Sequence, residues 1–194
     1  MARSVLLFAG LGNPGRQYRA NRHNIGFHLL DRVAEKWGIS FTRLQNEALV
    51  CDAIRGERKV ILAKPQTLMN ASGRSIAALL RFYKAEPGSL VVTYDDIDLP
   101  FGSIRIRPAG GSGGHRGMRS IIREVGSEDF ARIRLGIDRP PGRMEAADYV
   151  LQDFHESELE LLEHTLTRAA DCFEKLLDLG LEASMNSCNP AIDE

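Results

Sequence analysis

The stretch SVLLFAGLGNPG at residues 4–15 decides the fold, because it joins an apolar run directly to a tight turn. A continuous apolar run closed by glycines predicts a strand that is buried on both faces of a sheet. The run is too short to span a bilayer, and no small-residue cleavage site of a signal peptide follows it. We therefore expect a core strand of a cytoplasmic protein that does not associate with membranes.

The turn after this strand also matches the pattern of a dinucleotide-binding loop, G-x-G-x-x-G, at residues 10–15. That loop requires a helix that begins within the glycines, and an acidic residue at the end of the next strand about 20 residues later. Here Pro14 interrupts the pattern, residues 18–21 delay the helix, and Asp31 falls in the middle of it. We expect a tight strand-to-helix turn and no dinucleotide site.

Outward from this turn, patterns typical of helices and strands alternate along the chain. Helices are predicted at 21–38, 70–88, 118–126 and 157–179, and strands at 4–12, 48–56, 59–65, 89–96, 102–108 and 130–138. The two strands at 48–65 form a hairpin, and Ser157 with Glu160 forms a capping box for the last helix. The order predicts an α/β fold: one domain over 1–194, with a twisted mixed sheet, helices on both faces, and the 157–179 helix packed on the sheet.

Charge is distributed unevenly although the formal net charge is only −1. Residues 103–143 hold nine arginines against four acidic residues, whereas residues 144–194 hold two basic residues against 13 acidic ones. The arginines could gather on one face and bind a polyanion, or they could be separate solvated side chains. Composition alone does not decide between these alternatives.

The three cysteines, Cys51, Cys172 and Cys188, are widely separated and include no C-x-x-C pair. Their spacing predicts neither a metal site nor a disulfide.

Several polar side chains lie where strands end or helices begin, and the carboxyl ends of strands in an α/β sheet face one crevice. They are Asn13, His23, Asn70, Asp95, Asp96, His115 and Arg116. Each alone is compatible with a capping, surface or turn role. Together they provide a histidine–carboxylate pair for general-base catalysis and amides that bind carbonyls or water. Because no serine or cysteine has a nucleophile signature, we expect direct attack by water.

Five motifs, in register, resemble the bacterial-type peptidyl-tRNA hydrolases. They are GLGNPG at 10–15, YRANRHNIG at 18–26, KPQTLMNASG at 64–73, YDDIDLPFG at 94–102 and GGSGGHRGMRSI at 110–121. The resemblance covers essentially the whole chain. It implies hydrolysis of the ester between a peptide and the 3′ ribose of tRNA, which recycles tRNA shed by ribosomes. It further implies a monomer that needs no metal or cofactor.

The resemblance also assigns roles to individual residues. His23 is implied as the catalytic base and Asp95 as its orienting partner. Asn13 and Asn70 position substrate and water, and Tyr18 and Met69 shape the cleft. Arg107, Arg134 and Arg143 are implied to contact tRNA phosphates of the acceptor stem and 5′ end. Such contacts favour the alternative in which the arginines gather on one face and bind a polyanion.

Two positions depart from the family pattern. Arg116 stands where the family usually has asparagine, and Leu68 stands where an aromatic residue is usual. A guanidinium accepts no hydrogen bond, so Arg116 is expected to bind a phosphate or carbonyl of the CCA end rather than to position water. Two alternatives are a non-catalytic RNA-binding relative on the same fold and a hydrolase of free peptides. The presence of His23, Asp95, Asn13 and Asn70 favours the esterase.

Overall fold

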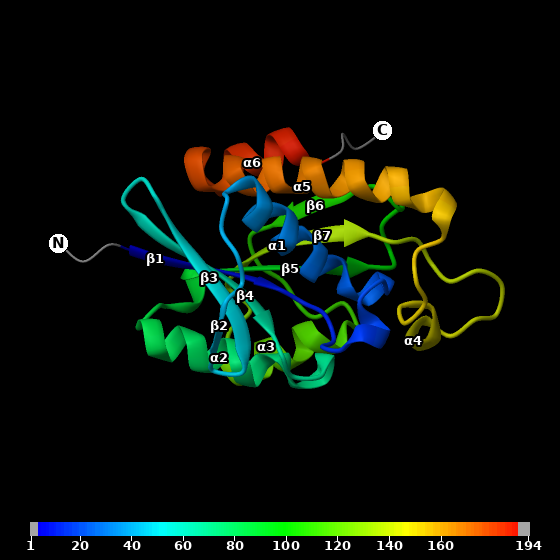
Figure 1. Cartoon of the computed structure of the whole chain (residues 1–194), viewed down its shortest axis with the longest axis horizontal. Coiled ribbons are helices and arrows are strands. Elements are labelled where there is room, and N and C mark those ends of the chain that lie inside the picture. Colours follow the sequence, from blue (N-terminus) through cyan, green and yellow to red (C-terminus); the bar gives the residue numbers. More distant parts are fainter. Residues whose placement is uncertain (1–3, 190–194) are drawn as a thin grey trace.

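The computed structural model describes residues 4–189, in which a seven-stranded mixed sheet lies between two layers of helices (Figure 1). The strand order is β2-β3-β4-β1-β5-β7-β6. The strands are β1 (Ser4–Gly10), β2 (Arg43–Gln45), β3 (Ala48–Arg55), β4 (Arg58–Pro65), β5 (Leu90–Asp96), β6 (Ile104–Arg107) and β7 (Ala131–Gly136). The four central strands are parallel, and β2, β3 and β6 pair antiparallel at the two edges.

Helices cover both faces of this sheet, so the predicted single-domain α/β fold is confirmed. They are α1 (Ile25–Lys36), α2 (Ser72–Tyr83), α3 (Arg116–Val125), α4 (Ala146–Tyr149), α5 (Leu159–Leu179) and α6 (Leu181–Cys188). Helices α1, α5 and α6 pack on one face, and α2 and α3 pack on the other (Figure 1). The sequence patterns predicted neither the short edge strand β2 nor α6. No helix within residues 4–189 has the length and apolar composition needed to cross a bilayer.

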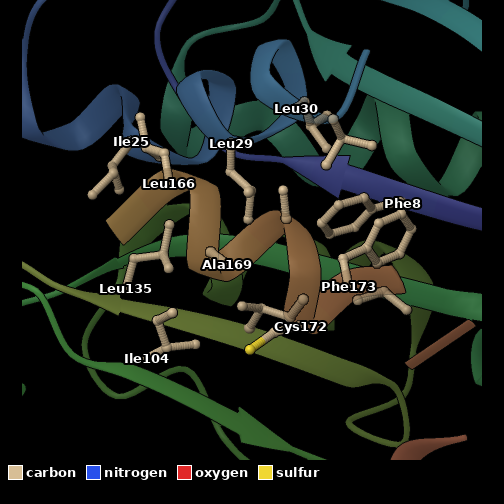
Figure 2. Close-up of a cluster of buried hydrophobic side chains, with 14 of the residues drawn as sticks. Phe8, Ile25, Leu29, Leu30, Ile104, Leu135, Leu166, Ala169, Cys172 and Phe173 are labelled. Atoms are coloured by element: carbon tan, nitrogen blue, oxygen red, sulfur yellow. The ribbon is translucent and has the colours of Figure 1, made fainter. Parts of the chain in front are cut away.

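The core on the face of the sheet covered by α1 and α5 brings together β1 and α5, which are far apart in the sequence (Figure 2). Phe8 of β1 stacks on Phe173 of α5 with 3.7 Å between ring centroids, and Leu29 and Leu30 of α1 are buried beside them. Each such side chain contributes about 1.5–3 kcal/mol when it is removed from water. Helix α5 therefore belongs to the same core as β1.

The start of α5 differs from the prediction. The helix begins at Leu159, after one 3-10 turn, η5 (Glu156–Glu158). The Glu158 carboxylate accepts the backbone N–H of His155 at 2.7 Å, so the predicted cap of Ser157 and Glu160 is wrong. Glu158 also accepts hydrogen bonds from Arg22, at 2.9 and 2.6 Å. This contact comes from a distant part of the chain and fixes the 3-10 turn η5 that precedes α5.

The prediction that the cysteines form no disulfide is also wrong. Cys172 and Cys188 are joined, with their Cα atoms 6.0 Å apart. The chain reverses at Gly180, whose φ of +86° suits glycine, and α6 then packs against α5. Cys51 is the free cysteine among the described residues, and burial raises the pKa of its thiol to about 11.

Close contact between α2 and α3 depends on Gly73. Its N–H donates to Ser120 Oγ at 3.0 Å, and a Cβ at this position would lie 2.1 Å from the Ser120 carbonyl oxygen. We expect Gly73→Ala to lower the free energy of unfolding by about 2–3 kcal/mol, because the helices must separate. Gly88→Ala is the control, since a Cβ there meets nothing within 4 Å. Urea unfolding followed by circular dichroism measures both, and equal midpoints would contradict the expectation.

Candidate active site

Strand ends and helix starts surround a cavity of about 870 Å³. Nine of the ten predicted site residues line it: Asn13, Tyr18, His23, Met69, Asn70, Asp95, Arg107, Arg116 and Arg134. Arg143 does not line this cavity and lies exposed in a turn after β7. The crevice expected at the carboxyl ends of the strands is therefore present.

The centre of the cavity is a buried pair formed by His23 and Asp95. His23 lies in a 3-10 turn, η2 (Arg22–Asn24), and Asp95 lies at the end of β5. His23 Nδ1 is 2.8 Å from Asp95 Oδ1, and only 2% of the Asp95 side chain is exposed. An ionised carboxylate only accepts hydrogen bonds, so Nδ1 carries the hydrogen and Nε2 keeps a free lone pair.

The neighbours of His23 in sequence hold it in place. Gly26 allows α1 to approach the sheet, because a Cβ there would lie 2.6 Å from backbone atoms of Leu11 and Thr93. The backbone N–H of His23 donates to Val150 O at 2.8 Å. Arg22 is buried in its ion pair with Glu158. The contacts of the RHNIG segment at residues 22–26 thereby hold the backbone on both sides of His23.

His115 contacts the same carboxylate oxygen. Its Nε2 is 3.0 Å from Asp95 Oδ1, and its Nδ1 accepts the backbone N–H of Met118 at 3.2 Å as the N-cap of α3. Burial alone raises the pKa of Asp95, but His23 and His115 outweigh it and hold the pKa of this carboxyl well below its usual range. The sequence marked His115 as a candidate and assigned it no role.

Ligand atoms of His23, Asp95 and His115 lie within 4.8 Å of one another, close enough to be tested as a metal site. A metal ion needs a lone pair from each imidazole. Because His115 Nδ1 accepts from Met118, the hydrogen of the neutral ring lies on Nε2, the atom that faces Asp95. The geometry therefore fits hydrogen bonding better than metal coordination.

Asn13 is held so that its amide nitrogen is available to the cavity. Its Oδ1 accepts the Met69 N–H at 2.8 Å. Its backbone exchanges two hydrogen bonds with the Asn24 side chain, at 2.8 and 2.9 Å. Within residues 4–189, Asn13 Nδ2 donates to no protein acceptor. Asn24 was not among the site residues expected from the sequence, although Asn24 follows His23 directly.

The arginines near the cavity have different environments. Arg107 is exposed at the end of β6, and Arg134 forms an ion pair with Asp96. Arg132 is buried, and its Nη1 donates to the carbonyl oxygens of Gly110 and Gly111 at 2.5 and 3.0 Å. The guanidinium of Arg132 therefore supports the loop at residues 109–115, before α3, rather than facing solvent.

Comparison with known proteins identifies the family to which this chain belongs. The family model described as "Peptidyl-tRNA hydrolase" matches residues 7–194. The chain belongs to the peptidyl-tRNA hydrolase family. The enzyme is thus a hydrolase that acts on ester bonds, with peptidyl-tRNA as its substrate.

Individual relatives agree with this assignment over nearly their full length. The peptidyl-tRNA hydrolase of Chloroflexus aurantiacus is 49% identical over 95% of this chain and 98% of its own. That of Chloroflexus aggregans is 46% identical, with the same coverage. The crystal structure of peptidyl-tRNA hydrolase from Acinetobacter baumannii matches with a TM-score of 0.89 and 30% identity, covering 97% of this hydrolase and 96% of that chain.

Proposed function

We propose that His23 is the general base that activates water in ester hydrolysis and that Asp95 orients it. The main support is the buried contact of 2.8 Å between His23 Nδ1 and Asp95 Oδ1 inside the cavity. Asp95 fixes the tautomer with hydrogen on Nδ1 and stabilises the imidazolium that forms during the reaction. His23 Nε2 is then free to accept a proton from water.

The reaction proceeds by addition and elimination. Water attacks the ester carbonyl carbon as its proton passes to His23 Nε2, and the carbonyl oxygen gains negative charge. Asn13 Nδ2 donates a hydrogen bond to this oxygen. The bond to the ribose 3′ oxygen then breaks, and the proton on His23 passes to that oxygen. The second proton of the attacking water stays on the new carboxyl group and is lost to solvent when that group ionises, so the products are a peptide carboxylate, tRNA with a free 3′ hydroxyl and one released proton.

Different groups of residues bind different parts of the substrate. Tyr18, Met69 and Asn70 contact the peptide end, whereas Arg116 binds a phosphate or carbonyl of the CCA end. Arg107, Arg134 and Arg143 contact phosphates of the acceptor stem and the 5′ end. The enzyme acts as a monomer in the cytoplasm, with the acidic α5 surface away from the RNA.

Release of an N-acetylated amino acid from its tRNA tests this function. The purified protein is assayed in excess chelator, and we expect rapid hydrolysis that deacylated tRNA inhibits. Loss of activity in chelator would contradict a metal-independent reaction. Cleavage of free peptides without inhibition by deacylated tRNA would contradict the specificity for the ester of tRNA.

Removing the arginines should change the salt dependence of tRNA binding. For Arg107→Ala and Arg134→Ala, we expect weaker binding and a plot of log K against log salt that is shallower by about 0.7–0.9 per lost phosphate contact. Arg168→Ala, on the exposed side of α5, is the control. An unchanged slope in both variants would place the RNA elsewhere. The same titration of Arg116→Ala tests that residue, and unchanged affinity would exclude its role.

A further inference from the structure

One carboxylate oxygen of Asp95 lies within hydrogen-bonding distance of two imidazoles. His23 Nδ1 lies 2.8 Å and His115 Nε2 lies 3.0 Å from Asp95 Oδ1, and the two ring centroids are 5.0 Å apart. The histidines come from different parts of the fold, η2 before α1 and the N-cap of α3. Their shared partner is nearly inaccessible to solvent, so water cannot replace either donor without cost.

The fold fixes which nitrogen of His115 carries hydrogen. Its Nδ1 accepts the Met118 N–H at 3.2 Å, a bond that would be lost if Nδ1 also carried hydrogen. The neutral ring therefore donates from Nε2 to Asp95.

We propose that His115 is a positioning residue that divides the charge of Asp95 and thereby keeps His23 in its neutral, base-competent form. The inference rests on the proposed role of His23. A carboxylate oxygen that accepts a second hydrogen bond stabilises a neighbouring imidazolium less than an undivided one does. The second donor also fixes the rotation of the Asp95 side chain, so that the acceptor stays directed at His23 Nδ1.

The other titratable groups beside the pair belong to residues that the His115 substitutions do not replace. Tyr94 and Asp96 come from β5, and Asp96 is already paired with Arg134 of β7. Arg116 reaches the cavity from α3, and Glu145 reaches it from the loop before α4. None of these four donates to Asp95 within the described residues, so the effect of His115 can be measured separately.

Two substitutions separate the two contacts of His115. Asparagine is a strong N-cap, so His115→Asn keeps the bond to Met118 but is too short to reach Asp95. Glutamine places an amide N–H near the position of Nε2, so His115→Gln keeps the donor to Asp95 and gives up the cap. The pH profiles of kcat and kcat/KM are measured for both variants and the parent.

For His115→Asn we expect the acid limb of both profiles to move upward by about 0.5–1 pH unit, with KM nearly unchanged. At pH 6 the rate falls by about 3- to 10-fold, whereas at pH 8.5 it stays within about threefold of the parent. His115→Gln keeps the acid limb within about 0.2 unit of its original position. ¹⁵N chemical shifts of the His115 ring should report hydrogen on Nε2.

Several outcomes would overturn the proposal. An unshifted limb in His115→Asn, an equal loss at every pH, or the same shift in both variants would show that His115 does not act on His23 through Asp95. Hydrogen on Nδ1 of His115 would do so as well. A parent enzyme whose rate does not fall in acid would instead refute His23 as the base, which is a failure of the proposed function and not of this inference alone.

Discussion

His23→Ala is expected to lower kcat for release of N-acetylamino acids from tRNA by about 10³-fold or more, while tRNA binding is retained. The reason is that the substitution removes the imidazole Nε2, the atom proposed to accept the proton of the attacking water. The arginines and the rest of the cavity remain. Single-turnover hydrolysis measures the chemical step, and filter binding of deacylated tRNA measures affinity.

A second histidine variant controls for the loss of an imidazole as such. His164 is exposed on α5, and His164→Ala should hydrolyse the ester at the parental rate. If His23→Ala retained more than about a tenth of the parental kcat, general-base catalysis by this residue would be refuted. Loss of tRNA binding in His23→Ala would instead show that the substitution had disturbed the cleft.

Local patterns were sufficient to predict the core of the fold, and they included His23 and Asp95 among seven candidate residues; the family resemblance then implied that these two form a pair. The apolar run that ends in GLGNPG predicted β1, and the runs before Asp95 and Arg134 predicted the neighbouring parallel strands. Because the carboxyl ends of the strands face one crevice, the sequence order predicted that these candidates, His23 and Asp95 among them, could converge there.

Features that depend on distant contacts were not predictable in this way. The cap at His155 depends on Arg22, and the Cys172–Cys188 disulfide depends on a helix reversal at Gly180. The two hydrogen bonds between the Asn24 side chain and the Asn13 backbone likewise join two separate turns. The residues of such contacts are present in the sequence, but they come together only in the folded protein.

Asp95→Asn is expected to lower kcat by about 10³- to 10⁴-fold with little change in KM. If the amide oxygen faces His23 Nδ1, it accepts the same hydrogen bond but carries no charge to stabilise the imidazolium. If the amide nitrogen faces Nδ1, that atom must accept, the hydrogen moves to Nε2, and the base is lost. Either orientation impairs catalysis, although the side chain keeps its size.

The stability of this variant distinguishes a chemical defect from a folding defect. Asp95 is buried, and asparagine removes a charge from that site, so we expect Tm to stay within about 4 °C of the parent. Asp98→Asn, at an exposed carboxylate that pairs with Arg139, should retain activity within about threefold. A Tm loss of more than about 10 °C in Asp95→Asn would attribute the defect to unfolding. A kcat above about a tenth of the parental value would show that His23 needs no charged partner, and would also remove the basis for any influence of His115 through this carboxylate.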